Sequence, residues 1–162
     1  MTDANTPDAN TTDENTPDAK ATDVNTTDVK TPPPQVWPTL RAADARALIR
    51  FLVDAFGFEE VVSYGDADRV DHAQLSWPLG GGIMLGSASG RGQDDPWALA
   101  PGTFGCYVVA DDVDALHERA TRAGAEVVKP LSDTDYGSRE FIARDPEGNL
   151  WSFGTYRGEP QP

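Results

Sequence analysis

The chain has 162 residues and a formal net charge of −14 at pH 7, which is enough length for one folded domain with its own core. This acidic balance excludes a nucleic-acid partner, because nothing would neutralise the phosphates, and it excludes binding to an anionic membrane surface for the same reason. The single cysteine, Cys106, excludes an internal disulfide. The sequence shows neither a leader with a basic start and an apolar run nor a long apolar stretch, so we expect a cytoplasmic protein that is not bound to a membrane.

The first part of the chain, residues 1–35, is expected to be a disordered acidic tail. Residues 3–32 split into six pentapeptides, DANTP, DANTT, DENTP, DAKAT, DVNTT and DVKTP. Val24 and Val29 are their only sizeable apolar residues, which is too little hydrophobic surface to offset the entropy of ordering the chain. The repeats are either a solvating leader or a docking or phosphorylation tail, and the prolines that end them form a stiff linker.

Two amphipathic helices are predicted in the body of the chain, over residues 44–57 and 112–124. Each begins near an aspartate and ends at a glycine, as helix caps prefer. Each follows a short strand, over 36–41 and 105–110. Each is followed by Glu-Val-Val and then by two further strands that a tight turn joins.

The order β-α-β-β-β therefore occurs twice, in a first module over 36–90 and a second module over 103–158, with a linker over 91–102. Segments 71–84 and 139–152 can be laid over each other without a gap, which supports the repeat. We predict an α+β fold in which the two modules form a curved, eight-stranded half-barrel with outer helices.

Four short motifs occur in a characteristic order: Ala-Phe-Gly-Phe at 55–58, Asp-Asp-Val-Asp-Ala at 111–115, Ala-Gly-Ala at 123–125 and Asp-Pro-Glu-Gly-Asn-Leu-Trp at 145–151. In this respect the chain, from 36 to 156, resembles the vicinal oxygen chelate superfamily, which includes glyoxalase I, bleomycin-resistance proteins and extradiol dioxygenases. The resemblance implies a concave cavity lined by both modules, often a homodimer and, in many members, a divalent metal ion.

The expectation of a bound metal ion can be tested at the positions that match the family's metal ligands. The family's enzymes have one ligand on the first strand and one on the last strand of each module. Those positions hold Trp37, Met84, Gly105 (or Cys106 after a one-residue slip) and Ser152. None offers the carboxylate oxygen or imidazole nitrogen that such cations prefer. We therefore predict a metal-free member of the fold with no cofactor.

Strand alternation predicts which side chains line the cavity. The expected ligand-binding residues are Trp37, Thr39, Gln74, Met84, Tyr107 and Ser152, together with Trp97 of the linker. Trp97 either covers the cavity mouth or pins the linker to the body. Trp151 and Phe153 are expected to face the core, and His117 to lie on a solvated helix face.

His72 and Glu140 occupy matching positions in the overlay of the two modules. If a pseudo-two-fold axis relates the modules, the two side chains approach the cavity from opposite sides. Histidine titrates near neutral pH, and burial can raise the pKa of a glutamate toward it, so the pair could perform general acid–base catalysis. The alternative is two polar side chains that neighbouring groups satisfy.

Three functions follow. The preferred one is a bleomycin-resistance-like protein, a homodimer that sequesters a planar or cationic small molecule and thereby confers antibiotic resistance. The second is a metal-independent glyoxalase-like lyase or isomerase that uses His72 and Glu140. The third is a metal-dependent enzyme whose ligands the alignment above misplaces.

Overall fold

The computed structural model describes residues 34–88, 92 and 94–160. The expected disordered tail lies outside these residues, apart from its last two positions. No helix in the described part of the chain is long and apolar enough to cross a membrane.

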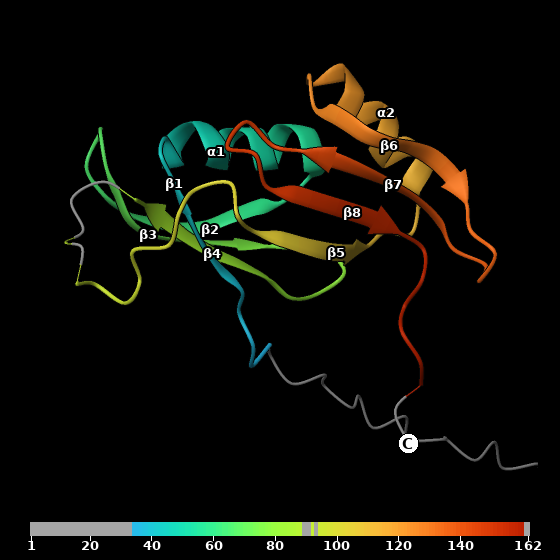
Figure 1. Cartoon of the computed structure of the whole chain (residues 1–162), viewed down its shortest axis with the longest axis horizontal. Coiled ribbons are helices and arrows are strands. Elements are labelled where there is room, and N and C mark those ends of the chain that lie inside the picture. Colours follow the sequence, from blue (N-terminus) through green and yellow to red (C-terminus); the bar gives the residue numbers. More distant parts are fainter. Residues whose placement is uncertain (1–33, 89–91, 93, 161–162) are drawn as a thin grey trace, which may run out of the picture. The chain divides into compact units, whose positions relative to one another are not determined.

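The order β-α-β-β-β occurs twice along the chain (Figure 1). The first module contains β1 (Thr39–Ala42), α1 (Ala45–Phe51), η1 (Leu52–Phe56), β2 (Glu59–Gly65), β3 (Val70–Ser76) and β4 (Gly82–Ser87). The second contains β5 (Gly105–Val109), α2 (Val113–Arg122), β6 (Glu126–Asp133), β7 (Arg139–Arg144) and β8 (Leu150–Gly154). The predicted α+β class and the repeated order are confirmed.

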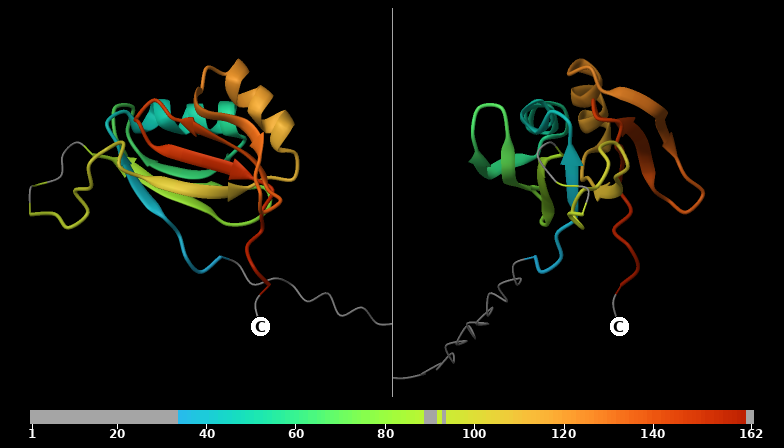
Figure 2. Two further views of the ribbon diagram at one scale, coloured as in Figure 1. Left: turned by 45° about the vertical axis from the view of Figure 1, so that its right-hand side comes forward. Right: turned by 60° about the vertical axis from the view of Figure 1, so that its left-hand side comes forward.

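The strands form two open four-stranded sheets, sheet A with the order β1-β4-β3-β2 and sheet B with the order β5-β8-β7-β6. In both sheets the first strand runs parallel to the last strand of its module, and the other neighbours are antiparallel. No backbone ladder joins the two sheets within the described residues. Helices α1 and α2 lie side by side, while residues 34–38 and 155–160 leave on the opposite side of the sheets (Figures 1 and 2).

Both helices begin where the sequence predicts. The carboxylate of Asp44 accepts a hydrogen bond from Ala47 N at 2.9 Å, and Asp112 does the same for Ala115 N at 2.9 Å. Gly57 ends the first helix with a φ of 87°, which a side chain would disfavour. One difference is that the end of this helix, η1, is a π-helix.

Each sheet has one buried face and one open face, as strand alternation predicts. The buried face carries Leu40, Leu75, Ile83 and Leu85 in sheet A and Phe141, Trp151 and Phe153 in sheet B. Trp151 and Phe153 have no exposed surface, so their expected position in the core is confirmed. The opposite, open faces carry the side chains that were expected to line a cavity.

Aromatic rings make the two modules share one core. Phe56 at the end of η1 packs against Phe153 and Trp151 of β8, with ring centroids 4.8 and 5.7 Å apart. Phe58 packs against Trp151 at 5.5 Å. His117 is half-buried against Phe141, edge to face at 5.0 Å, whereas the sequence predicted an exposed histidine on a solvated helix face.

The turns before the last strands correspond between the modules. Gly148 N donates to Asp145 O at 3.0 Å, and at the matching place Gly80 N donates to Trp77 O at 2.9 Å. Gly148 has a φ of 101°, in the left-handed region that favours glycine. The overlay proposed from the sequence therefore describes two equivalent turns.

Candidate functional site

Three predicted ligand-binding residues form a row across the open face of sheet A. The parallel ladder pairs Thr39 of β1 with Met84 of β4, and the antiparallel ladder pairs Met84 with Gln74 of β3. Paired residues in a sheet point to the same face. The thioether of Met84 is therefore flanked by a hydroxyl and an amide, all partly accessible.

The ladders show which first-strand residues lie directly beside the last-strand positions Met84 and Ser152. The residue of the first strand beside Met84 is Thr39 rather than Trp37. In the second module the residue beside the last-strand position is Tyr107 rather than Gly105. In both modules the neighbour in the ladder lies two residues after the position that the sequence indicated.

The set of side chains that the ladders bring together also does not fit the metal of the family's enzymes. It consists of Thr39, Met84, Tyr107 and Ser152. Neutral hydroxyl groups and a thioether are poor ligands for a hard or borderline divalent cation. No group of three or more His, Cys, Asp or Glu side chains in the described residues could hold a metal ion elsewhere.

Cys106, the alternative ligand after a one-residue slip, belongs to the other face of sheet B, since it pairs with the buried Trp151. Burial raises the pKa of its thiol to about 12, and the nearby negative charge of Asp145 adds to the effect. The thiolate that a metal or an electrophile requires is therefore scarce at neutral pH.

A pocket of about 310 Å³ lies on the open face of sheet A. It is lined by Thr39, Arg41, Asp71, His72, Met84, Leu85 and Trp97. The Nε of Arg41 donates to the backbone oxygen of Trp97 at 3.2 Å, which holds the linker here, while the Trp97 side chain stays 52% exposed beside the pocket. Both roles considered for Trp97, linker anchor and pocket wall, are thus compatible with its position.

His72 and Glu140 have separate neighbours. The ring of His72 stacks on Tyr64, with centroids 6.3 Å apart and 24° between the planes. Glu140 is buried on sheet B and accepts hydrogen bonds from Tyr136 OH at 2.8 Å and Lys129 Nζ at 3.0 Å. In the described part of the chain no hydrogen bond or ion pair joins the two.

The pKa of Glu140 is lowered from its ordinary value, not raised toward that of histidine as the acid–base pair would require. The hydrogen bond from Tyr136 and the ammonium group of Lys129 stabilise the carboxylate, and together they outweigh burial and lower its pKa. Glu140 is therefore ionised at neutral pH and is not a ready proton donor.

The open face of sheet B is partly filled by the protein's own side chains. The Tyr107 hydroxyl accepts a hydrogen bond from Tyr156 N at 3.0 Å and lies 3.4 Å from Ser138 Oγ. The rings of Tyr136 and Tyr156 meet edge to face at 5.8 Å. Ser152 is half-buried on this face, away from the pocket on sheet A.

Trp37, the remaining predicted ligand-binding residue, lies before β1. Its indole N–H donates to the backbone oxygen of Pro34 at 3.2 Å. It is half-buried but does not line the pocket on sheet A. Of the seven predicted ligand-binding residues, the structure thus brings Thr39, Met84 and Trp97 together in one pocket.

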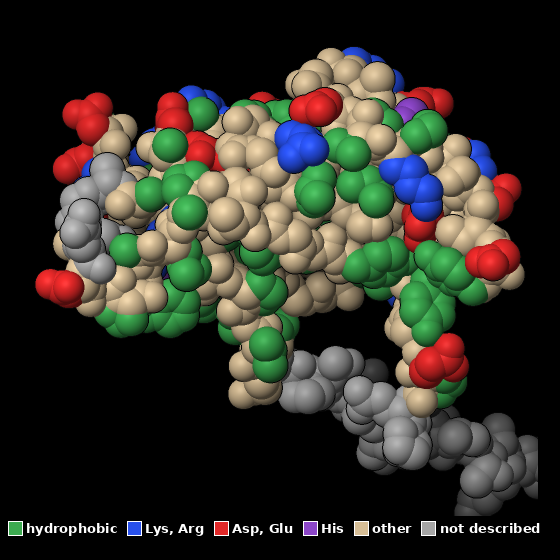
Figure 3. Space-filling view, viewed as in Figure 1, with side chains coloured by type: hydrophobic (Ala, Val, Ile, Leu, Met, Phe, Trp, Pro, Cys, Tyr) green, Lys and Arg blue, Asp and Glu red, His purple; other side chains and the backbone are tan. Residues whose placement is uncertain are grey.

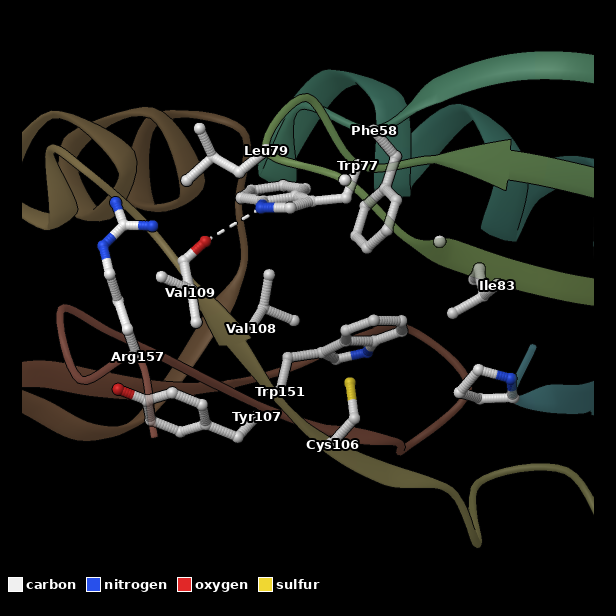
Figure 4. A pocket seen from close by; sticks show the side chains of 13 residues that line it. Phe58, Trp77, Leu79, Ile83, Cys106, Tyr107, Val108, Val109, Trp151 and Arg157 are labelled. Carbon is white, nitrogen blue, oxygen red and sulfur yellow. Dashed lines mark hydrogen bonds between the residues drawn. The ribbon is translucent and has the colours of Figure 1, made fainter. Parts of the chain in front are cut away.

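A second cavity, of about 330 Å³, lies between the two modules, and the sequence reasoning missed it (Figure 4). Its walls include the rings of Phe58, Trp77, Tyr107 and Trp151. The one signal of this cavity in the sequence was Trp77, because the matching position in the turn of the second module is Asp145 and not an aromatic residue. Which strand that ring would meet was not visible from sequence spacing.

Residues 35–153 match the family model described as the Glyoxalase/Bleomycin resistance protein/Dioxygenase superfamily. An uncharacterized protein of Mycobacterium bovis is 33% identical over 126 residues, which cover 75% of this chain and 82% of the relative. A relative of Mycobacterium tuberculosis, also described as uncharacterized, is 33% identical over 126 residues, covering 75% of this chain and 74% of its own length.

Solved structures with the same fold include TioX from Micromonospora sp. ML1. It is 30% identical, has a TM-score of 0.61 and covers 74% of this chain and 97% of its own. A glyoxalase/bleomycin resistance protein/dioxygenase from Nocardioides is 21% identical with a TM-score of 0.56, covering 83% of this chain and 92% of its own. The second likeness concerns the fold alone.

Proposed function

Because this chain belongs to the Glyoxalase/Bleomycin resistance protein/Dioxygenase superfamily, we propose that it is a metal-independent binding protein that holds a planar small molecule on the open face of sheet A. The fold alone does not fix a function, so the lining of the site carries the argument. The supporting observation is the pocket that His72, Met84 and Trp97, from three separate segments, line together.

The lining favours a planar ligand over a cationic one. Small-molecule sites combine apolar and aromatic walls with a few placed polar groups, as Met84, Trp97 and their neighbours do. Arg41 lines the same pocket and is 8% exposed, so a positive charge already stands there. The acid of the pocket, Asp71, forms an ion pair with Arg69 at 2.7 Å and is partly neutralised.

The enzyme alternatives have less support. An acid–base reaction would need His72 and Glu140 on one substrate, yet each has its own neighbours and the pKa of Glu140 is lowered. The metal-dependent alternative would need carboxylate or imidazole ligands, which Thr39, Met84, Tyr107 and Ser152 do not supply. Sequestration, the bleomycin-resistance-like role, requires neither.

We also propose that the protein is a cytoplasmic homodimer. Large apolar side chains are exposed on the folded unit, including Val36 (84%), Leu150 (40%) and Tyr156 (39%). Figure 3 shows hydrophobic side chains gathered along the side of the molecule from which residues 34–38 and 155–160 leave. Exposed apolar side chains gathered on one side of a molecule are typical of an interface.

The binding proposal can be tested with one ring system in three charge states. The full-length chain is titrated calorimetrically with 2-naphthol, 2-naphthoate and 2-naphthylmethylammonium, and its mass is measured by sedimentation velocity. We expect the protein to bind these planar compounds. We expect Trp97→Ala to weaken their affinity about two- to tenfold, since an aromatic pair contributes about 0.5–1.5 kcal/mol.

The matched control is Trp37→Ala, which removes an indole outside the pocket and should leave the affinity unchanged. Equal losses for both substitutions would contradict the assignment of the pocket. Elemental analysis of the purified protein is the second check, because stoichiometric Zn, Ni, Fe or Mn would overturn metal independence.

A further inference from the structure

The strand β5 is an edge of sheet B, because within the described residues it pairs with β8 alone. At one end of this ladder Leu150 N donates to Phe104 O at 3.0 Å, and at the other Ala110 N donates to Gly154 O at 2.9 Å. In a parallel ladder the N–H and the C=O of one residue point to the same side of the strand, and this side alternates from one residue to the next. The even-numbered residues from 104 to 110 therefore turn their N–H or C=O groups toward β8.

The odd-numbered residues of β5 consequently point their backbone groups away from β8. Gly105, Tyr107 and Val109 are these residues, and four consecutive residues of β5, 106–109, line the cavity between the modules. Val109 O already accepts a hydrogen bond from Trp77 Nε1 at 2.8 Å. Tyr107, in the middle of this edge, offers one N–H donor and one C=O acceptor for which no described strand supplies a partner.

Aromatic faces border the cavity beside this edge (Figure 4). The ring of Phe58 packs against Trp77 at 5.0 Å and against Trp151 at 5.5 Å. Both indole N–H groups are engaged, that of Trp77 with Val109 O and that of Trp151 with Asp145 Oδ2 at 2.9 Å. Phe58 and Trp151 are only 3% and 0% exposed, so the half-buried Trp77 offers the accessible ring face, and the hydrogen-bonding capacity is concentrated on the backbone of β5.

The charge of the lining does not favour an ion. The charged side chain among the lining residues is Arg157, which stands at one end of the cavity in Figure 4. Its guanidinium group forms an ion pair with Asp111, and both side chains are largely exposed. The volume of about 330 Å³ is at the lower end of small-molecule sites, which suits a ligand of one or two rings.

We propose that this inter-module cavity is a second binding site, for an uncharged, flat aromatic molecule that carries an amide or lactam group. The ring lies against Trp77, which Phe58 supports from behind, and the ligand's N–H and C=O bond to the free backbone groups on the edge of β5, as an added strand would. The site is separate from the pocket on sheet A, so it does not rest on the function proposed above.

The test uses quinolin-2(1H)-one, a two-ring lactam, and its N-methyl derivative, which lacks the donor and carries a methyl group in its place. We expect the full-length protein to bind the first compound and to bind the second about five- to tenfold more weakly, because a lost hydrogen bond costs about 1 kcal/mol and leaves a carbonyl unpaired. Calorimetry measures the affinities. In a ¹⁵N-labelled sample, the amide signals of Tyr107 and Val109 should shift on addition of the lactam.

Two variants separate this site from the one on sheet A. Cys106→Met extends a side chain into the cavity and should abolish lactam binding, whereas Trp97→Ala should leave it unchanged. Because Cys106→Met alters a half-buried position, its fold is checked by thermal unfolding, and Leu79→Ala at the exposed rim serves as a second variant that should weaken binding two- to threefold.

Equal affinity for the two quinolinones would overturn recognition by the strand edge. If the folded chain does not bind quinolin-2(1H)-one, the site itself is overturned. The same conclusion holds if sedimentation shows a dimer in which the second copy covers the cavity. Loss of lactam binding in Trp97→Ala would assign the ligand to sheet A instead. Failure of the naphthalene titrations would leave the lactam result intact, so the two proposals fail separately.

Discussion

At the scale of single residues, Asp145 explains why the turn before the last strand has its sequence. Its Oδ1 accepts hydrogen bonds from Glu147 N at 3.0 Å and Asn149 N at 2.9 Å. Its Oδ2 accepts from Asn149 Nδ2 at 2.8 Å and Trp151 Nε1 at 2.9 Å. The carboxylate is 4% exposed, so one acidic side chain satisfies four donors in a buried place.

Replacing Asp145 by asparagine should destabilise the protein by about 2–3 kcal/mol. An amide has one oxygen and one NH₂ group, so at least one buried donor, such as the indole N–H of Trp151, would face another donor. Denaturation in urea measures the free energy of unfolding. The control is Asp44→Asn at the start of α1, where asparagine caps a helix as well as aspartate does, and we expect less than about 0.5 kcal/mol. Similar losses in both variants would show that the buried hydrogen bonds matter less than the negative charge.

At the scale of elements, the helix formed by α1 and η1 is held at both ends by the second module. The carboxylate of Glu147 accepts hydrogen bonds from Ala43 N at 2.9 Å and Asp44 N at 2.7 Å, just before the helix begins. At the other end Arg119 of α2 donates to Val53 O at 2.7 Å and to Asp54 O at 2.8 Å. Glu147 thus supplies an acceptor for N–H groups at the start of the helix, and Arg119 adds donors at its end, where Val53 O also accepts from Gly57 N at 3.2 Å. Side chains of the second module therefore stabilise both ends of a helix in the first.

We predict that Glu147→Ala and Arg119→Ala each lower the free energy of unfolding by about 1–2 kcal/mol, and that the double variant loses the sum. Additivity is expected because the two side chains share no partner and act at opposite ends of the helix. Urea titrations of the two single variants and the double variant measure this. Arg122→Ala, an exposed arginine on the same helix, is the control and should cost less than about 0.5 kcal/mol. A double variant that loses much less than the sum would contradict independent action at the two ends.

The sequence predicted those elements whose signals are local. The helix caps at Asp44 and Asp112 and the alternation that buries Trp151 depend on neighbours a few residues away, and the structure agrees with them. The exception within a helix is the π-helical end, for which the periodic pattern contained no distinct signal.

Features that depend on pairing between distant segments could not be predicted in the same way. Strand alternation identified the open face, but the register that puts Thr39 rather than Trp37 beside Met84 is set by a ladder across the sheet. The pKa of Glu140 depends on Tyr136, which lies in the turn before β7. No periodic pattern in the sequence indicates where that side chain points. The candidate site was therefore predicted as a face of a sheet and only partly as a set of neighbouring side chains.

At the scale of the whole folded unit, the interface between the modules is part of the hydrophobic core. The rings of Phe56 and Phe58 come from the first module and pack on Trp151 of the second, which has no exposed surface. The hydrogen bond from Trp77 to Val109 O crosses the same boundary at 2.8 Å. A module separated from its partner would leave these rings in water, at a cost of about 25 cal/mol for each Å² of apolar surface.

We therefore predict that residues 34–160 unfold in a single transition rather than module by module. Far-ultraviolet circular dichroism, which reports on both helices, and tryptophan fluorescence, which includes Trp77 and Trp151 at the boundary, should give superimposable curves in guanidinium chloride. Phe56→Ala should move both curves together, with a loss of about 3–4 kcal/mol, because the cavity that it opens lies between the modules. Measurements at several protein concentrations separate the dissociation of a dimer from unfolding. Two resolved transitions, or a Phe56→Ala curve in which only one probe shifts, would mean that the shared core does not couple the modules.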